Sequence, residues 1–274
     1  MSRLQVLCAT MHQTDFSKIA EMNIQSDVIF ANQADRTELA ECSFGHYTAK
    51  MVTTSTRGVG INRNLLLSYA DAEICLMADD DVCYNDGYAE TVLAAFDRHP
   101  NADIIVFNLT SGSSERRIYQ NRKRRWLTKW TPNPFGGPRI AFRLSAVRKC
   151  NLWFTAMFGG GAPFPSGEDS LFLQDALKRG LKIFCETDVI GSVDVSKSTW
   201  FTGFDKKMYL GKGAYYAAVH PRSQALWRLY FALRSHKAAT VSFADRLRYM
   251  RQGAKLFANY KIGMTLHEEI DHCQ

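Results

Sequence analysis

Short strand-like runs alternate with helix-like stretches through the first two-thirds of this 274-residue chain. The predicted strands are rich in Val, Ile, Leu and Phe and cover residues 4–9, 27–31, 47–52, 73–78 and 103–108. Helical spacing covers residues 14–25, 61–70 and 86–98, and Pro100 stops the last of these. Such alternation is typical of βαβ units, so the sequence predicts an α/β fold with a mainly parallel sheet flanked by helices.

The pattern changes after residue 108. Residues 110–138 mix basic and aromatic side chains with a Pro/Gly-rich turn, which indicates a surface excursion. We expect further strands at 139–144, 181–185 and 188–194, and a helix at 168–179 capped by Ser166 or Gly167 and ended by Gly180. From about residue 204 the chain is helical, aromatic and basic. The predicted domains are therefore a catalytic domain over 1–203 and a helical, basic C-terminal extension over 204–274.

The composition is that of a soluble globular protein, with 46% hydrophobic and 22% charged residues. The formal net charge is +7. Acidic residues lie mostly in the first hundred positions, whereas Arg and Lys dominate from Arg116 onward. This asymmetry indicates an anionic partner. The partner could be a phosphorylated substrate, a nucleic acid or an anionic membrane surface, and charge alone does not choose among these.

Seven cysteines are scattered along the chain without a Cys-x-x-Cys pair, which gives no indication of a zinc site. Reduced thiols in a reducing compartment fit this pattern best. The first residues lack the apolar core of a signal peptide, and no apolar stretch is long enough to cross a bilayer. We therefore expect a cytoplasmic protein.

Three consecutive aspartates, Asp79, Asp80 and Asp81, directly follow the apolar run at 74–78. Open α/β sheets bind ligands at the carboxyl ends of their strands, which is where these acids would lie. A solvated turn would explain one such acid, but three adjacent like charges repel one another. A divalent cation that itself holds a phosphate supplies the missing counter-charge, so the sequence predicts a metal–diphosphate site.

Two other segments carry candidate chemistry. Glu168 and Asp169 open a predicted helix, and the helix dipole alone would favour acids at this position. The preceding glycine triplet at 159–161 favours a functional role, because it suits a loop that moves or admits a substrate. Gly58 and Gly60 open the helix before the aspartate strand, and this helix carries Arg63. Arginine is a natural bidentate partner of a diphosphate.

Taken together, these residues resemble the family 2 glycosyltransferases, which have the GT-A fold, a Rossmann-like fold of nucleotide-diphospho-sugar transferases. The resemblance rests on the strand-end acids, on the Gly-x-x-Arg-Asn start of the helix at 60–64, and on Gly-Glu-Asp-Ser-Leu-Phe-Leu at 167–173. It spans roughly residues 4–200, and the chain looks most like bacterial members that build capsular or other surface polysaccharides.

The resemblance implies a single-displacement transfer from a nucleotide-activated sugar with inversion at the anomeric carbon. Asp79 and Asp81 match the family's Asp-x-Asp motif, whose acids contact the nucleotide ribose and a manganese or magnesium ion, and Asp80 could replace either. Asp169 matches the general base that deprotonates the acceptor hydroxyl, and Glu168 matches its supporting neighbour.

The resemblance also implies positions for the rest of the donor. Thr10, and Asn32 or Asp35, match positions that hold the nucleotide base, and Arg63 matches an arginine near the diphosphate. Relatives often place a metal-binding His after the Glu-Asp helix, and Asp194 is the nearest candidate here. Family habit favours a UDP-sugar as donor and a saccharide, lipid-diphosphate-linked in some relatives, as acceptor.

The basic segments have several interpretations. Residues 116–129, with Trp126 and Trp130, suit a solvated loop, a grip on nucleic acid or a face toward a lipid-linked acceptor at the inner leaflet. Residues 226–234 and 243–249 mix aromatic and basic side chains in helices. Such helices lie at a membrane surface as peripheral contacts, pack on the catalytic domain or pair with a second subunit as a homodimer.

Two other functions compete with the transferase. A haloacid-dehalogenase-type phosphohydrolase also places Asp-x-Asp after a strand, but it usually has Thr or Val where this chain has Cys83, and its motif ends the first strand. A basic nucleic-acid-binding protein leaves the acidic triplet and the Glu-Asp helix unexplained. The sequence therefore favours the transferase and makes nucleic acid the weaker partner.

Overall fold

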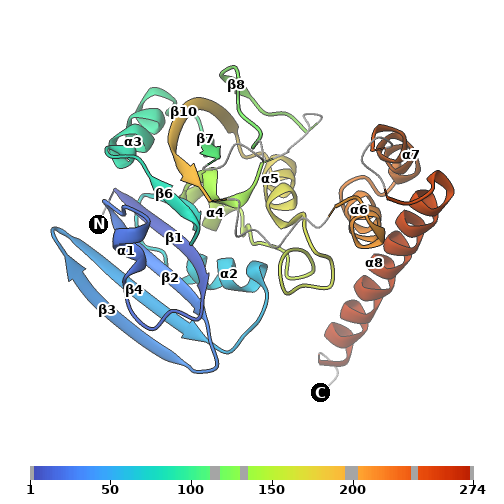
Figure 1. The fold of residues 1–274 in the computed structure, drawn as a ribbon, viewed down its shortest axis with the longest axis horizontal. Coiled ribbons are helices and arrows are strands. Elements are labelled where there is room, and N and C mark those ends of the chain that lie inside the picture. Colours follow the sequence, from blue (N-terminus) through green and yellow to red (C-terminus); the bar gives the residue numbers. More distant parts are fainter. Residues whose placement is uncertain (1–2, 112–117, 130–134, 195–202, 236–239, 272–274) are drawn as a thin grey trace. The chain divides into compact units, whose positions relative to one another are not determined.

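The computed structural model describes residues 3–111, 118–129, 135–194, 203–235 and 240–271 (Figure 1). The chain divides into two compact units. The first comprises Met1–Met157 and Glu168–Ser198, and the second comprises Phe158–Gly167 and Thr199–Gln274. The loop that leads into the Glu-Asp helix thus groups with the C-terminal helices.

The first unit is built on one ten-stranded sheet (Figure 1). The strand order is β3-β4-β2-β1-β5-β9-β7-β10-β6, with β8 paired to β10. The strands are β1 (Leu4–Met11), β2 (Asp27–Gln33), β3 (Glu38–Phe44), β4 (Tyr47–Thr54), β5 (Ile74–Asp79), β6 (Val82–Tyr84), β7 (Ile104–Ser111), β8 (Arg125–Trp126), β9 (Ile140–Arg143) and β10 (Ile183–Val193). The predicted α/β class is confirmed.

Six strands of the sheet run in one direction (β1, β2, β4, β5, β7 and β10), in line with the prediction of a mainly parallel sheet, and the others run antiparallel to their neighbours. β1 pairs in parallel with β2 and β5, β2 with β4, and β7 with β10. The pairs β3–β4, β5–β9, β7–β9, β6–β10 and β8–β10 are antiparallel. The chain leaves the sheet at the carboxyl end of β7 and re-enters it at that same end as β9, so β9 runs antiparallel to its neighbours β5 and β7.

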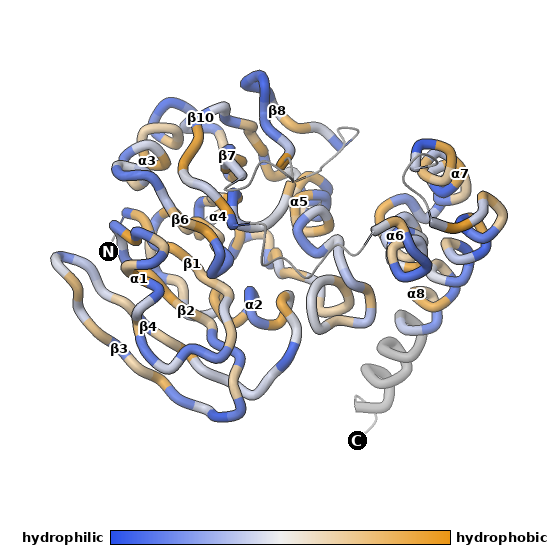
Figure 2. Tube along the Cα trace, viewed as in Figure 1, coloured by the Kyte–Doolittle hydropathy of each residue, from blue (hydrophilic) through white to orange (hydrophobic). Residues whose placement is uncertain are grey.

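Helices cover both faces of this sheet. α2 (Val59–Tyr69), α4 (Leu144–Lys149) and α5 (Glu168–Lys178) contribute Leu66, Val147 and Phe172 to the hydrophobic core on one face. α3 (Tyr88–Arg98) contributes Val92 and Phe96 to the core on the other face, beside the short α1 (Lys18–Glu21). A 3₁₀ turn, η1 (Gly137–Arg139), precedes β9. The strands between these layers carry the most hydrophobic stretches of the unit (Figure 2).

Several predicted elements are corrected. The helix predicted at 14–25 is shorter than expected and consists of α1 alone. Asn23, just beyond α1, has a positive φ of 51°, with which the helix cannot continue. The edge strand β3 was missed because its residues alternate between half-buried and exposed positions and include Glu38 and Glu41. The strands predicted at 181–185 and 188–194 are one strand, β10, whose register shifts between Cys185 and Val189.

Part of the predicted surface excursion is buried. Leu127 and Phe135 are 6% and 3% exposed and belong to the core. The side-chain amide of Asn121 donates to the carbonyl oxygens of Val106 and Glu186, both at 3.0 Å. These bonds satisfy the backbone where β10 is irregular, which explains why the segment returns to the sheet. Arg116, Arg117 and Trp130 of the predicted basic segment lie outside the described residues.

The second unit contains α6 (Lys206–Val219), α7 (Gln224–Arg234) and α8 (Phe243–Asp271). α6 and α8 meet at glycines: a Cβ on Gly213 would lie 2.0 Å from the Met250 carbonyl oxygen, and one on Gly253 would lie 1.9 Å from that of Leu210. Only residues without a side chain permit such an approach. Among the described residues, no helix combines the length and the apolar character needed to span a bilayer.

Candidate active site

Arg63 is the centre of the candidate site. Its side chain is 2% exposed on α2 and forms ion pairs with three carboxylates. One terminal nitrogen lies 2.9 Å from Asp79 Oδ1, and the other lies 3.3 Å from Glu168 Oε1 and also contacts Asp169 Oδ1. Residues from α2, the end of β5 and the start of α5 are thereby brought together.

The local fold explains how Arg63 reaches these acids. Gly60, one turn earlier on α2, admits the Thr155 carbonyl oxygen to within 2.2 Å of where a Cβ would lie. Asn64 exchanges hydrogen bonds of 2.9 and 2.8 Å with the backbone of Phe154. The Phe154 ring then lies under the guanidinium, 5.4 Å from Cζ, and stacks on Phe172 of α5 with centroids 4.1 Å apart. The packing therefore fixes α5 relative to Arg63.

Gly137 is a site residue that the sequence reasoning missed. Its backbone N–H donates to Asp169 Oδ2 at 2.7 Å. A Cβ at this position would lie 2.6 Å from Arg63 Nη2 and 2.8 Å from Asp169 Oδ1, so only glycine fits beside the ion pair. The available signal was the Gly136-Gly137 pair, which was assigned to a surface turn.

The cluster is electrostatically strained, because three carboxylates share one guanidinium. Burial alone would lower the pKa of Arg63, but Asp169, Asp79 and Glu168 hold this pKa above its usual value. Burial raises the pKa of Asp169 well above the usual carboxyl range, and the charge of Glu168 adds to the rise, whereas Arg63 opposes it. A carboxyl group that has a raised pKa and lies near the carboxyl ends of the strands is a candidate proton acceptor.

The acidic triplet sends its three side chains to different partners. Asp79 bonds to Arg63, whereas Asp80 Oδ2 accepts a 2.5 Å hydrogen bond from the Thr10 hydroxyl at the end of β1. Asp81 Oδ1 is buried and has no hydrogen-bond partner among the described residues. Burial, followed by the charges of Asp79 and Asp80, raises the pKa of Asp81 to about 7. The backbone N–H of Asp194 donates to the Asp81 carbonyl oxygen at 3.0 Å, which brings Asp194 beside the triplet.

Two predicted nucleotide contacts lie at and just beyond the carboxyl end of β2. Asn32 is fully buried, and its amide bonds to both the N–H and the carbonyl of Gln13, at 2.9 Å each, and to the Thr53 hydroxyl at 3.1 Å. Its hydrogen-bonding groups are therefore occupied. Asp35 lies beyond β2 with its side chain 89% exposed and forms an ion pair with Arg57.

The acids offer the hard oxygen donors that magnesium and manganese prefer, and the orphaned Asp81 Oδ1 fits such an ion. In the part of the chain that the structure describes, however, no three His, Cys, Asp or Glu side chains are arranged to hold a metal ion. Magnesium bound with a nucleotide usually takes one or two carboxylates and completes its shell with phosphate and water oxygens. The donor set therefore fits a metal that arrives with a diphosphate.

We predict that Gly137→Ala disrupts this site, because its methyl group would overlap Arg63 and Asp169. The expected loss of transition-state stabilisation is about 1–3 kcal/mol, the usual range for overpacking, or roughly 5- to 150-fold in kcat/KM. Gly136→Ala is the matched control, since among the described residues its Cβ would meet Pro138 Cδ alone, at 3.8 Å. Equal activity of the two variants in a sugar-transfer assay would contradict the assignment of Gly137.

Comparisons with known proteins give the fold and a match to one family over part of the chain. Residues 28–158 match the family model of glycosyl transferase family 2. The crystal structure of S. aureus TarS 1-349 matches with a TM-score of 0.59 at 14% identity, over 95% of this chain and 92% of that one. The same protein in complex with UDP-GlcNAc matches with a TM-score of 0.57 at 14% identity, over 92% and 71% of the two chains. No curated protein matches the sequence.

The region matched by the family model contains Arg63, Gly137 and the acidic triplet, and the solved structures share the fold. Neither comparison supports the phosphohydrolase or the nucleic-acid-binding alternative. Residues 28–158, just under half of the chain, are therefore similar to glycosyltransferase family 2, a family of enzymes, and the chain carries the GT-A fold that the sequence resemblance predicted.

Proposed function

We propose that this chain catalyses an inverting, metal-assisted transfer of a sugar from a nucleotide-diphospho-sugar to a saccharide hydroxyl during synthesis of a bacterial surface polysaccharide. The observation that carries the proposal is the contact of buried Arg63 with acids from both β5 and α5. A UDP-sugar is the favoured donor, because TarS has been solved with UDP-GlcNAc and with UDP. Membrane contact and a homodimer stay predictions from the sequence.

Asp169 is the proposed general base. In one displacement the acceptor oxygen bonds to the anomeric carbon, the bond from that carbon to the diphosphate breaks, and the acceptor proton passes to Asp169. The Gly137 N–H and the Arg63 guanidinium orient this carboxylate, and Glu168 supports it from the preceding position. Such general-base assistance contributes about 10²–10⁴-fold to a rate.

The donor is assigned to the carboxyl edge of β1 and β5. Asp81, with Asp79 and Asp194, would hold the metal ion, which when bound stabilises the charge that develops on the departing diphosphate. Asp80 and Thr10, which bond to each other, are placed at the ribose and base. Asp35 is exposed and free to reach a base, whereas Asn32 would act through Gln13, whose backbone it holds. The placement of Arg63 near the donor diphosphate stays a prediction.

The first test is Asp169→Asn. We expect turnover to fall by about 10²–10⁴-fold with nearly unchanged donor affinity, because the amide cannot accept the acceptor proton. The matched control is Asp175→Asn on the same helix, whose carboxylate pairs with the exposed Lys178. Near-normal turnover of the Asp169 variant in single-turnover kinetics would exclude Asp169 as the base.

The pH profile gives a second test. Asp169 acts deprotonated, so its raised pKa places the rising limb of kcat above the usual carboxyl range of about 4. The negative charge of Glu168 is one cause of that rise. Glu168→Gln removes this charge and is expected to move the limb to lower pH. If the rising limb of kcat in the Glu168→Gln variant moves to higher pH or stays in place at saturating substrate, the proposed coupling between Glu168 and Asp169 is contradicted.

Calorimetric titration with UDP tests the donor site. We expect binding that requires manganese, is lost with excess chelator and is weakened at least about tenfold in Asp81→Asn, because Asp81 Oδ1 is buried and has no hydrogen-bond partner in the described part of the chain. The control is Asp97→Asn, an exposed residue of α3 that pairs with Arg3. If UDP does not bind, other nucleoside diphosphates are titrated next, and failure of all of them would reject the nucleotide–metal assignment.

A further inference from the structure

A stripe of exposed apolar side chains runs along α7. Leu226, Leu229, Tyr230 and Leu233 are 70%, 43%, 49% and 57% exposed. Their spacing of three, four and seven places them on one side of the helix. Hydrophobic and hydrophilic residues correspondingly alternate along this helix (Figure 2). We call these four residues the α7 stripe.

The α7 stripe is not needed to hold the helix in its unit. The other side of α7 carries buried Ala232 and an aromatic cluster around Phe231, whose ring lies 5.9 Å from Tyr209 and 6.1 Å from Tyr216. Trp227 stacks on His220 with centroids 4.6 Å apart. The helix is therefore anchored from its inner side, while the side chains of the stripe are exposed.

Cations surround the stripe. Arg222 precedes its first leucine by one turn, and Arg234 follows its last, donating to the Tyr230 hydroxyl at 2.6 Å. No acidic partner is recorded for either arginine among the described residues, and α7 contains no Asp or Glu. Between positions 206 and 260 the sequence has eleven Lys or Arg and a single acid, Asp245.

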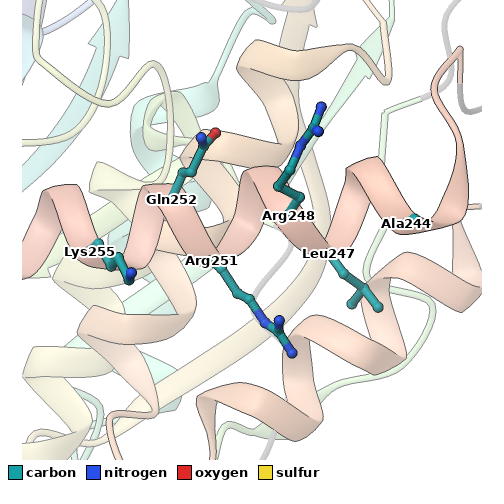
Figure 3. A pocket seen from close by; sticks show the side chains of 6 residues that line it. All are labelled: Ala244, Leu247, Arg248, Arg251, Gln252 and Lys255. Atoms are coloured by element: carbon teal, nitrogen blue, oxygen red, sulfur yellow. The ribbon is translucent and has the colours of Figure 1, made fainter.

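The neighbouring helix adds a cationic hollow. A cavity of about 540 Å³ on α8 is lined by Ala244, Leu247, Arg248, Arg251, Gln252 and Lys255 (Figure 3). Arg251 and Lys255 have no recorded ion pair among the described residues. Burial lowers the pKa of Arg228 on α7, and the nearby Arg251 lowers it further, so the two helices bring like charges together. An anionic surface would relieve that repulsion.

We propose that α7 docks the protein on an anionic phospholipid bilayer, with the α7 stripe inserted among the acyl chains and the arginines at the headgroup phosphates. An amphipathic helix with leucine and aromatic residues on one side and arginines around them has the chemistry of an interfacial helix. A second copy of the chain fits less well, because a symmetric pair would oppose two cationic surfaces. The proposal uses none of the residues assigned to catalysis or donor binding.

The test is flotation of the full chain with vesicles of phosphatidylglycerol and phosphatidylcholine, compared with phosphatidylcholine alone. We expect binding to the anionic vesicles at low salt. Leu229→Asn with Leu233→Asn is expected to weaken this partition at least about tenfold. The control is Leu39→Asn on β3, which is 57% exposed, like Leu233. Because all three leucines are exposed, each variant should keep the wild-type thermal midpoint.

A second variant separates charge from insertion. Arg222→Gln with Arg234→Gln is expected to weaken binding to the anionic vesicles at low salt, because two phosphate contacts are lost. Failure of the wild type to float, or equal binding by the leucine double variant, would overturn the proposal. So would a concentration-dependent dimer in sedimentation that the leucine variant dissociates without any vesicle binding, since the stripe would then be an interface between copies.

Discussion

The ion pairs of Arg63 are the interaction on which the candidate site depends. Taking a guanidinium and three carboxylates out of water carries a desolvation cost of several kcal/mol per ion, which their mutual attraction offsets only with good geometry. That geometry is supplied by Gly137, which leaves room beside the guanidinium, and by Phe154, which supports it from below. The excess negative charge that remains is consistent with a site completed by a cation and a substrate.

The loop 158–167 packs on the C-terminal helices within the second unit. Within that unit, the rings of Phe158 and Phe164 lie 5.8 and 6.2 Å from that of Phe257 on α8. A Cβ on Gly167 would lie 3.0 Å from the ring of Tyr215 on α6. The next residue in the chain is Glu168. The C-terminal helices therefore hold the loop 158–167 in place, which gives them a structural role independent of any membrane contact.

Periodicity predicted the elements that bury a full face. The strands β1, β2 and β5 and the helices α2, α3 and α5 lie within a few residues of their expected bounds, and the strand-end acids follow directly. Edge strand β3 escaped prediction because it buries little. The contact of Arg63 with Glu168 spans 105 positions, and Gly137 acts through its backbone N–H, so neither leaves a local pattern. The sequence singled out Arg63 as a site residue, but it did not predict the three carboxylates that Arg63 contacts.

The directions of the acidic triplet bear on the register that the sequence left open. Successive side chains of a strand point to opposite faces, so three adjacent acids cannot converge on one ion without a turn. Asp79 is paired with Arg63, and Asp80 accepts a hydrogen bond from Thr10. Asp81 keeps a buried oxygen without a hydrogen-bond partner among the described residues and has Asp194 beside it. The acid with the fewest stabilising contacts gains most from a cation, which makes Asp81 the strongest candidate of the three for the metal.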